Sequence, residues 1–244
     1  MKNIYILGLL LACNGPAIEQ DQTLEDISDI PTPSESIEED TGIVEDIPED
    51  PVTINYTFDD VDSLLYVQVF KDDGAVASGL AHDHVMRASN WNGLVSYNMG
   101  DIDECAMQFS LPVTDLQVDE DVMREYVGYG DTISASDRAT IREHMLADNQ
   151  LDAARNPTIS FVSSGCELID EGTLRVIGDM AIKNTVREWQ LDVDFTPRSD
   201  SFYASSVINF THSDFNITPY SAFFGAVKNA EPLKITFDIV GYEE

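Results

Sequence analysis

The sequence predicts a mainly β fold, an antiparallel barrel or sandwich with one or two short helices inserted between strands. Eight or more segments alternate apolar and polar residues with a period of two, which is typical of half-buried strands. Two such segments follow each other directly in residues 172–195 and predict a hairpin. One region, residues 136–154, instead has its apolar residues at helical spacing. These observations together indicate one β domain whose strands are joined by short turns.

The predicted hairpin is the element around which we expect the other strands to assemble. Its apolar residues occupy even positions as far as Ile182 and odd positions from Trp189 onward. Pairing Ile182 with Thr185 places both sets on one face and leaves residues 183–184 as the turn, although a four-residue loop keeps the same register. Trp189 then lies opposite Gly178, where its ring can cover the glycine. The hairpin therefore presents one broad apolar face that the rest of the chain must cover.

At the start of the chain, residues 1–12 resemble a secretory signal peptide. Lys2 precedes an apolar run at 4–12 that is too short to span a bilayer, which takes about 20 residues. The tetrapeptide LLAC ending at Cys13 resembles the lipobox of bacterial lipoproteins, which implies cleavage before Cys13 and lipid attachment to its sulfur. The alternative is an ordinary signal peptide with a chance cysteine. Asn14 follows instead of Asp, which by the sorting pattern of such lipoproteins indicates the outer membrane, facing the periplasm or the cell surface.

Residues 13–51 are expected to be a lipid-anchored, acidic, disordered tether for a folded domain at 52–244. Residues 14–51 contain thirteen Asp or Glu residues, five prolines and no Lys or Arg. Such a segment cannot bury enough apolar surface to offset its ordering entropy, and its like charges extend it. A charged partner-binding motif is the alternative interpretation.

The formal net charge of the 244-residue chain is −32. A charge of this sign and size repels the phosphates of nucleic acids, so we exclude a nucleic-acid partner. The motifs G-x-S-x-G, H-E-x-x-H, the P-loop and G-x-G-x-x-G do not occur. We therefore expect no enzymatic activity and assign no catalytic residue.

The domain at 52–244 consists mostly of predicted strands. Besides the hairpin, alternation predicts strands at 54–58, 65–69, 94–99, 105–113, 158–162, 202–210 and 233–239, and residues 78–87 are expected to form a loop that runs into a further strand.

The helical region lies between two of these strands. Ile141 and Met145 are four residues apart, Ser134 or Ser136 can cap the N-terminus, and Pro157 ends the region before the next strand.

Two cysteines remain if Cys13 is acylated. Cys105 and Cys166 form an even pair, which in an oxidising compartment is compatible with a disulfide; two buried free thiols are the alternative. Cys166 is out of register with the inward residues of its strand, and a bulge at residues 163–165 would correct this.

The domain resembles the YceI-like family over roughly residues 54–242. The resemblance is carried by LDAARNPTISFVSS at 151–164, by the hairpin with its core VIGDMAIK at 176–183, and by FTHSDFNITPY at 210–220. It implies a lipocalin-like antiparallel β-barrel of the bacterial periplasm that carries a long isoprenoid chain, and membership in a family with no agreed enzymatic activity. A homodimer is a further expectation from the resemblance, although no segment of the sequence singles out an interface. Asn216 stands where we expect a glycine, and Asn tolerates positive φ.

The resemblance, together with the inward apolar sets, leads us to expect a cavity for a polyisoprenoid, quinone or fatty chain and no other cofactor. A barrel of about eight strands has room for side chains or for one such ligand. A packed core, serving a scaffold or adhesion domain, is the alternative that the sequence leaves open. The residues expected to line the cavity are Met107, Phe109, Leu111, Val176, Met180, Trp189, Leu191, Val193, Phe210, Phe215, Phe223 and Phe224.

His82 and His84 are the candidate residues for the mouth of the cavity or for a metal site. On a strand, both would point to the same face, and this spacing can chelate Zn or Cu if His212 or a carboxylate completes the site. The alternative is that the two histidines form hydrogen bonds at the cavity mouth and contact the headgroup of a ligand. A periplasmic metal-binding module is therefore a second functional hypothesis.

Overall fold

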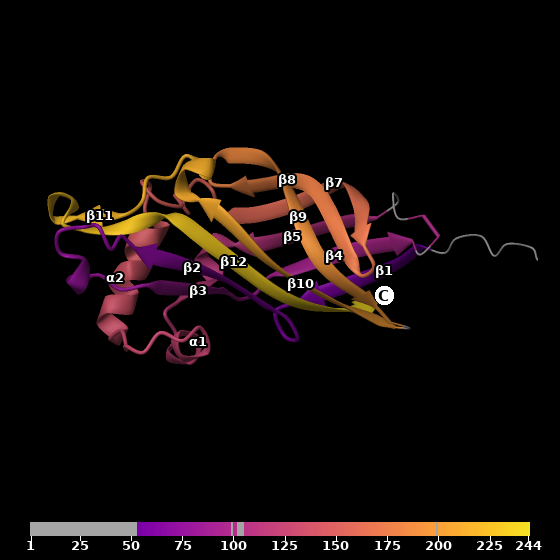
Figure 1. Ribbon diagram of the computed structural model, residues 1–244, viewed down its shortest axis with the longest axis horizontal. Helices are drawn as coiled ribbons and strands as arrows, with labels where there is room; N and C mark the ends of the chain where they lie inside the picture. Colours follow the sequence, from indigo (N-terminus) through magenta and orange to yellow (C-terminus); the bar gives the residue numbers. More distant parts are fainter. Residues whose placement is uncertain (1–52, 99, 102–104, 199) are drawn as a thin grey trace, which may run out of the picture. The chain divides into compact units, whose positions relative to one another are not determined.

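The computed structural model describes residues 53–98, 100–101, 105–198 and 200–244 (Figure 1). All of them belong to one unit, Pro48–Glu244. The predicted signal peptide at 1–12, Cys13 and the predicted tether at 13–51 lie outside the described residues.

In the described chain, eight antiparallel strands close into a barrel. Around the ring each strand pairs with the next, and the last strand pairs back with the first. A closed ring leaves no unpaired strand edge, which explains how so many alternating segments fit into one domain. In ring order the strands are β1 (Thr53–Asp59), β4 (Asn92–Asn98), β5 (Ala106–Pro112), β7 (Thr158–Asp170), β8 (Thr173–Ile182), β9 (Thr185–Pro197), β10 (Ser201–Thr211) and β12 (Val227–Glu243).

The long strand β12 changes partner along one edge. Its C-terminal residues pair with β1, and its earlier residues pair with β2 (Leu64–Lys71), which continues into β3 (His84–Ala88) and β6 (Leu116–Val118). At the change of partner, Val240 N–H donates to Ser63 Oγ at 3.1 Å, and the Ser63 hydroxyl donates to the Val240 carbonyl at 3.3 Å. This serine satisfies the backbone groups that neither β1 nor β2 reaches.

Two α-helices follow β6, and Figure 1 shows both near the same end of the barrel. The predicted helix is α2 (Ala135–Leu146), and the Ser134 hydroxyl caps it by accepting from Asp137 N–H at 3.1 Å. The other helix, α1 (Asp121–Tyr126), was not predicted. No helix in the described part of the chain is long and apolar enough to cross a membrane.

The predicted hairpin is confirmed as β8–β9, with Ile182 paired to Thr185. Trp189 lies opposite Gly178 as expected, but the ring nearest to the glycine belongs to Phe161, whose Cζ would be 2.7 Å from an added Cβ. Trp189 instead stacks on Phe215, with 5.8 Å between ring centroids. The interior neighbour on β7, rather than the cross-strand partner, therefore covers this glycine.

Of the two alternatives for Cys105 and Cys166, the structure has the disulfide, with the Cα atoms 5.7 Å apart. The register between β7 and β8 shifts between Ser163 and Gly165, as the bulge interpretation requires. This shift turns Cys166 to the inside of the barrel, where it is 4% exposed.

Candidate functional site

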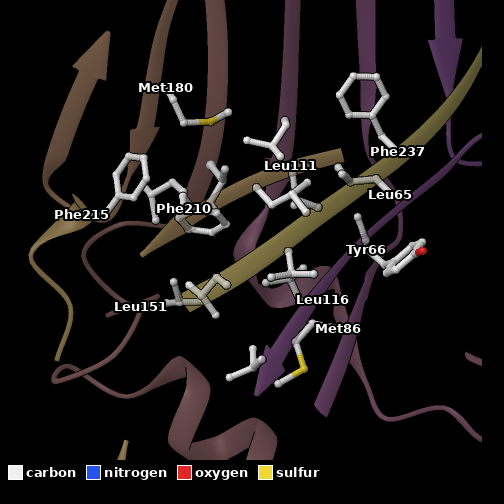
Figure 2. Close-up of a pocket in the computed structure, with 18 of the residues that line it drawn as sticks. Leu65, Tyr66, Met86, Leu111, Leu116, Leu151, Met180, Phe210, Phe215 and Phe237 are labelled. Atoms are coloured by element: carbon white, nitrogen blue, oxygen red, sulfur yellow. The ribbon is translucent and has the colours of Figure 1, made fainter. Parts of the chain in front are cut away.

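An apolar cavity lies inside the barrel near the end that carries the helices. Its volume is about 160 Å³. Figure 2 shows part of the lining, and the strands that contribute lining side chains are β2, β3, β5–β10 and β12. Helical-region residues Met145 and Leu151 also contribute to the wall. The barrel interior is therefore hollow at this end.

Seven of the twelve residues expected from the sequence line this cavity. They are Met107, Phe109, Leu111, Met180, Leu191, Phe210 and Phe215. Two smaller apolar cavities contain three more of the twelve: Val176 and Val193 line one of about 30 Å³, and Trp189 lines one of about 10 Å³.

The interior is filled at the end opposite the helices. Tyr97, Phe195 and Phe202 pack there with ring centroids 4.9 and 5.4 Å apart in succession. Met107, Phe237 and Ile239 line both the main cavity and the 30 Å³ cavity next to this aromatic cluster. These three side chains therefore lie between the hollow part of the barrel and the packed part.

The expectation that Phe223 and Phe224 line the cavity is wrong. Phe223 is 78% exposed and Phe224 is fully exposed. Both lie in a tight turn, η5 (Phe223–Gly225), with φ of 49° and 58°. A turn has no two-residue alternation, so an inward position could not be inferred from their spacing.

Several residues of the cavity wall were not among those expected from the sequence. Leu65, Val67 and Val69 on β2, and Leu233, Ile235 and Phe237 on β12, line the cavity. Their alternation was visible in the sequence and predicted the strands correctly. It did not show that these strands face the hollow part of the barrel, because this depends on the long-range pairing of β2 with β12.

Few polar groups reach the wall, and one of them is the side chain of His212, which is 6% exposed. It belongs to η4 (His212–Phe215), which ends at Asn216 with φ of 55°, so the asparagine does adopt the left-handed conformation. The Nδ1–H of His212 donates to the Glu231 carbonyl at 3.0 Å, since a carbonyl can only accept. Burial lowers the pKa of His212, and its hydrogen bonds to backbone carbonyls offset only part of this effect. The ring is therefore neutral at neutral pH.

Trp91 contributes a second polar group to the lining. The residue is 1% exposed, and no acceptor among the described residues lies within reach of its indole N–H. Gln150 and Thr211 are polar lining residues that are partly exposed. The wall as a whole can hold a hydrocarbon that carries few polar atoms.

His82 and His84 do not line the cavity. His82 bonds Asp131, and His84 Nδ1 lies 2.7 Å from Asp119 Oδ2. His212 is in the cavity wall, so the three histidines do not converge. In the described ranges, no group of three or more His, Cys, Asp or Glu side chains could hold a metal ion.

The two histidines instead belong to a network of charges that connects α1 with β3. Arg124 of α1 donates to Asp119 at 2.8 Å and to the Asp83 carbonyl at 2.8 Å, and both charged side chains are almost fully buried. Burial on its own would raise the pKa of Asp119. Hydrogen bonds and charges from His84, Val85 N–H and Arg124 outweigh it and lower the pKa. The arrangement is that of a structural ion cluster.

Comparisons with protein families and with solved structures identify proteins that are similar to this barrel. The family model for the YceI-like domain matches residues 56–240. BcnA of Burkholderia cenocepacia has 15% sequence identity and a TM-score of 0.53, with 73% of this chain and 95% of that chain covered. No curated protein matches the chain.

Two further solved structures have TM-scores below 0.5. The YCEI protein of Campylobacter jejuni has 13% identity and a TM-score of 0.46, covering 65% of this chain and 84% of its own. A polyisoprenoid-binding domain of Saccharophagus degradans has 8% identity and a TM-score of 0.49, covering 78% and 99%. The likeness to BcnA shows the shared fold.

Proposed function

This chain belongs to the YceI-like domain family, and from that premise we propose that it is a cell-envelope lipoprotein that binds an apolar lipid inside its barrel. The ligand class is a polyisoprenoid, a quinone or a fatty chain. The observation that carries the proposal is the apolar cavity at the helical end of the barrel.

The hydrophobic effect supplies the driving force for binding in such a cavity. An engineered apolar cavity of about 150 Å³ stays dry and accepts benzene or xenon, so a space of this kind is a site for hydrocarbon. A long chain needs more room than 160 Å³. Four of the seven methionines of the protein, Met86, Met107, Met145 and Met180, line the cavity. Methionine side chains have three rotatable bonds, so this wall can adapt its shape to a chain that enters.

The polar groups of the wall indicate how the ligand lies. Gln150 is partly exposed and belongs to the segment that follows α2, so a polar headgroup is expected beside it. The hydrocarbon tail then runs toward Met107 and Phe237, deeper in the barrel. A charged headgroup does not fit the inner part of the cavity, because the wall there offers no countercharge.

Attachment to a membrane is the second part of the proposal. Its support is the apolar run at 4–12 followed by LLAC ending at Cys13. Acyl chains on Cys13 would hold the barrel at the outer membrane, facing the periplasm or the cell surface, on the acidic segment at 13–51. Loss of radiolabelled palmitate incorporation in Cys13→Ser is the expected result, and unchanged labelling would refute this part alone.

Native mass spectrometry of the purified protein tests lipid binding directly. We expect a co-purifying lipid of low polarity that organic extraction removes, and measurable affinity of the extracted protein for polyprenols, quinones or fatty acids. Absence of both the lipid and the affinity would refute the proposal.

A cavity-blocking variant links the binding to this site. Met145→Trp introduces a bulky ring into the cavity from α2, outside the barrel strands, and should weaken ligand binding at least tenfold. Met145→Leu conserves volume and is the matched control, which should bind as the wild type does. Equal binding by both variants would place the lipid elsewhere on the protein.

A further inference from the structure

Four large apolar side chains are exposed on two loops at one end of the barrel. Phe223 is 78% exposed, Phe224 is fully exposed, and Val76 and Leu80 are 96% and 75% exposed. Exposed apolar side chains that gather in one place indicate a surface that contacts another molecule or a membrane. Phe223 and Phe224 do not line the cavity, so the exposure of their rings needs another explanation.

The two loops are held together by backbone hydrogen bonds. Ala77 N–H donates to the Ala226 carbonyl at 2.8 Å, and Asp72 N–H donates to the Lys228 carbonyl at 2.8 Å. Figure 1 shows β11 (Ser221–Ala222) and the loop after β2 together at the end of the barrel where α2 lies. We call residues 74–82 and 217–230 the tip.

The backbone of the tip places both phenylalanine rings in solvent at an energetic cost. Phe223, Phe224 and Gly225 have φ of 49°, 58° and 89°, so three successive residues are left-handed. Bulky residues rarely adopt this conformation, and such strain is most common at functional sites. Glycine or asparagine at positions 223 and 224 would avoid this backbone strain, but neither residue has an aromatic ring to expose.

The tip also differs from the rest of the chain in charge. The chain contains 45 Asp and Glu residues among 244, but residues 74–82 and 217–230 contain none. Of the carboxylates at the base of the tip, Asp72 pairs with Lys228 at 3.3 Å, Asp73 pairs with Lys71 at 3.7 Å, and Asp131 bonds His82. The tip therefore has no carboxylate of its own, and its one lysine is paired, on a protein that otherwise repels anionic surfaces.

The tip is continuous with the wall of the cavity. Phe215 and Ile217 line the cavity, and Phe223 follows only six residues after Ile217. The exposed rings and the hollow end of the barrel therefore belong to the same end of the molecule.

We propose that the tip docks on a lipid bilayer, with Phe223 and Phe224 inserted into the interfacial region and the hollow end of the cavity held next to the membrane. A bilayer suits the tip better than a protein partner does, because two projecting rings on loops without a carboxylate need depth of apolar medium rather than a matching surface. Passage of a lipid between bilayer and cavity rests on the proposed function, whereas the docking does not.

Tryptophan fluorescence in the full-length protein tests the docking. In Phe224→Trp the new indole replaces a fully exposed ring, and the spectrum of the wild type accounts for Trp91 and Trp189. In vesicles of phosphatidylcholine we expect its emission to shift to shorter wavelength, and brominated phosphatidylcholine should reduce it at least twofold. The matched control is Leu168→Trp, an exposed apolar position on β7 near the other end of the barrel, whose emission should stay unquenched.

The outcomes separate docking from ligand binding. If vesicles do not quench the indole of Phe224→Trp, the docking is overturned. The docking is also overturned if the emission of this indole changes only when envelope proteins are added. Equal quenching at positions 224 and 168 would also overturn it, since the anchor alone could cause that. Quenching confined to position 224 supports docking even if mass spectrometry finds no lipid in the cavity, in which case the proposed function alone falls. Circular dichroism of both variants verifies that they are folded.

Discussion

His212 illustrates, at the scale of a residue, how an ionisable group is retained in an apolar wall. Its Nδ1–H is satisfied by the Glu231 carbonyl, and burial lowers its pKa from the ordinary 6.5. The folded protein therefore holds a neutral ring where the unfolded chain takes up a proton near pH 6.5. Below that pH the unfolded state binds more protons at His212, so the contribution of this residue to the free energy of unfolding decreases as pH falls.

Replacement of His212 by glutamine should remove this part of the pH dependence. From about pH 8 to about pH 5 the wild type is expected to lose stability more steeply than His212→Gln, so the difference between their free energies of unfolding shrinks as pH falls. Urea unfolding across this range measures it. His144→Gln, at an exposed position of α2, is the control. Parallel pH profiles of wild type and His212→Gln would contradict the assignment.

At the scale of elements, β5 and β12 set the depth of the cavity through Met107 and Phe237. In Met107→Ala the main cavity should merge with the 30 Å³ space beyond it. We expect the variant to bind longer isoprenoid alcohols at least tenfold more tightly, because roughly two more buried methylene groups at about 0.8 kcal/mol each suffice for a factor of ten. Dissociation constants for alcohols of increasing length measure the effect.

Met107→Leu is the matched control for this experiment, because it keeps the volume that separates the two cavities. Its preference for ligand length should match that of the wild type. If Met107→Ala also keeps that preference, the depth of the cavity is not limited at this position.

Elements with a strong period were predictable from the sequence, and those without one were not. The β8–β9 register, the cap of α2 at Ser134 and the bulge before Cys166 all follow from local patterns. Helix α1 has only six residues, too few to show a helical period. Phe223 and Phe224 lie in a turn, where spacing does not predict direction.

The cavity itself lay beyond local pattern. Phe195 and Phe210 both alternate inward along their strands, yet Phe195 packs in the aromatic cluster and Phe210 lines the hollow end. Which outcome applies depends on how strands distant in sequence pair around the ring. One such long-range feature is the pairing of β12 with both β1 and β2, which no local signal in the sequence indicates.

At the scale of the whole molecule, the disulfide closes a long loop that contains both helices. Cys105 and Cys166 are separated by 61 residues, and this segment contains β5, β6, both helices and the first part of β7. The bond joins the beginning of β5 to β7 at the packed end of the barrel, near the aromatic cluster. It therefore restricts the unfolded chain over the segment that contributes the helical wall of the cavity.

Removal of this bond should lower stability without opening the barrel. For Cys105→Ala/Cys166→Ala we expect a loss of about 2–4 kcal/mol in the free energy of unfolding, since a closed loop of this length strongly limits the unfolded ensemble. Urea is the suitable denaturant, because guanidinium is a salt and would screen the net charge of −32. Reduction of the wild type should reproduce the effect, and the double variant should not respond to reductant. The hollow end lies away from the bond, so lipid affinity below the transition should persist. An unchanged urea midpoint would show that strand pairing alone already orders residues 105–166.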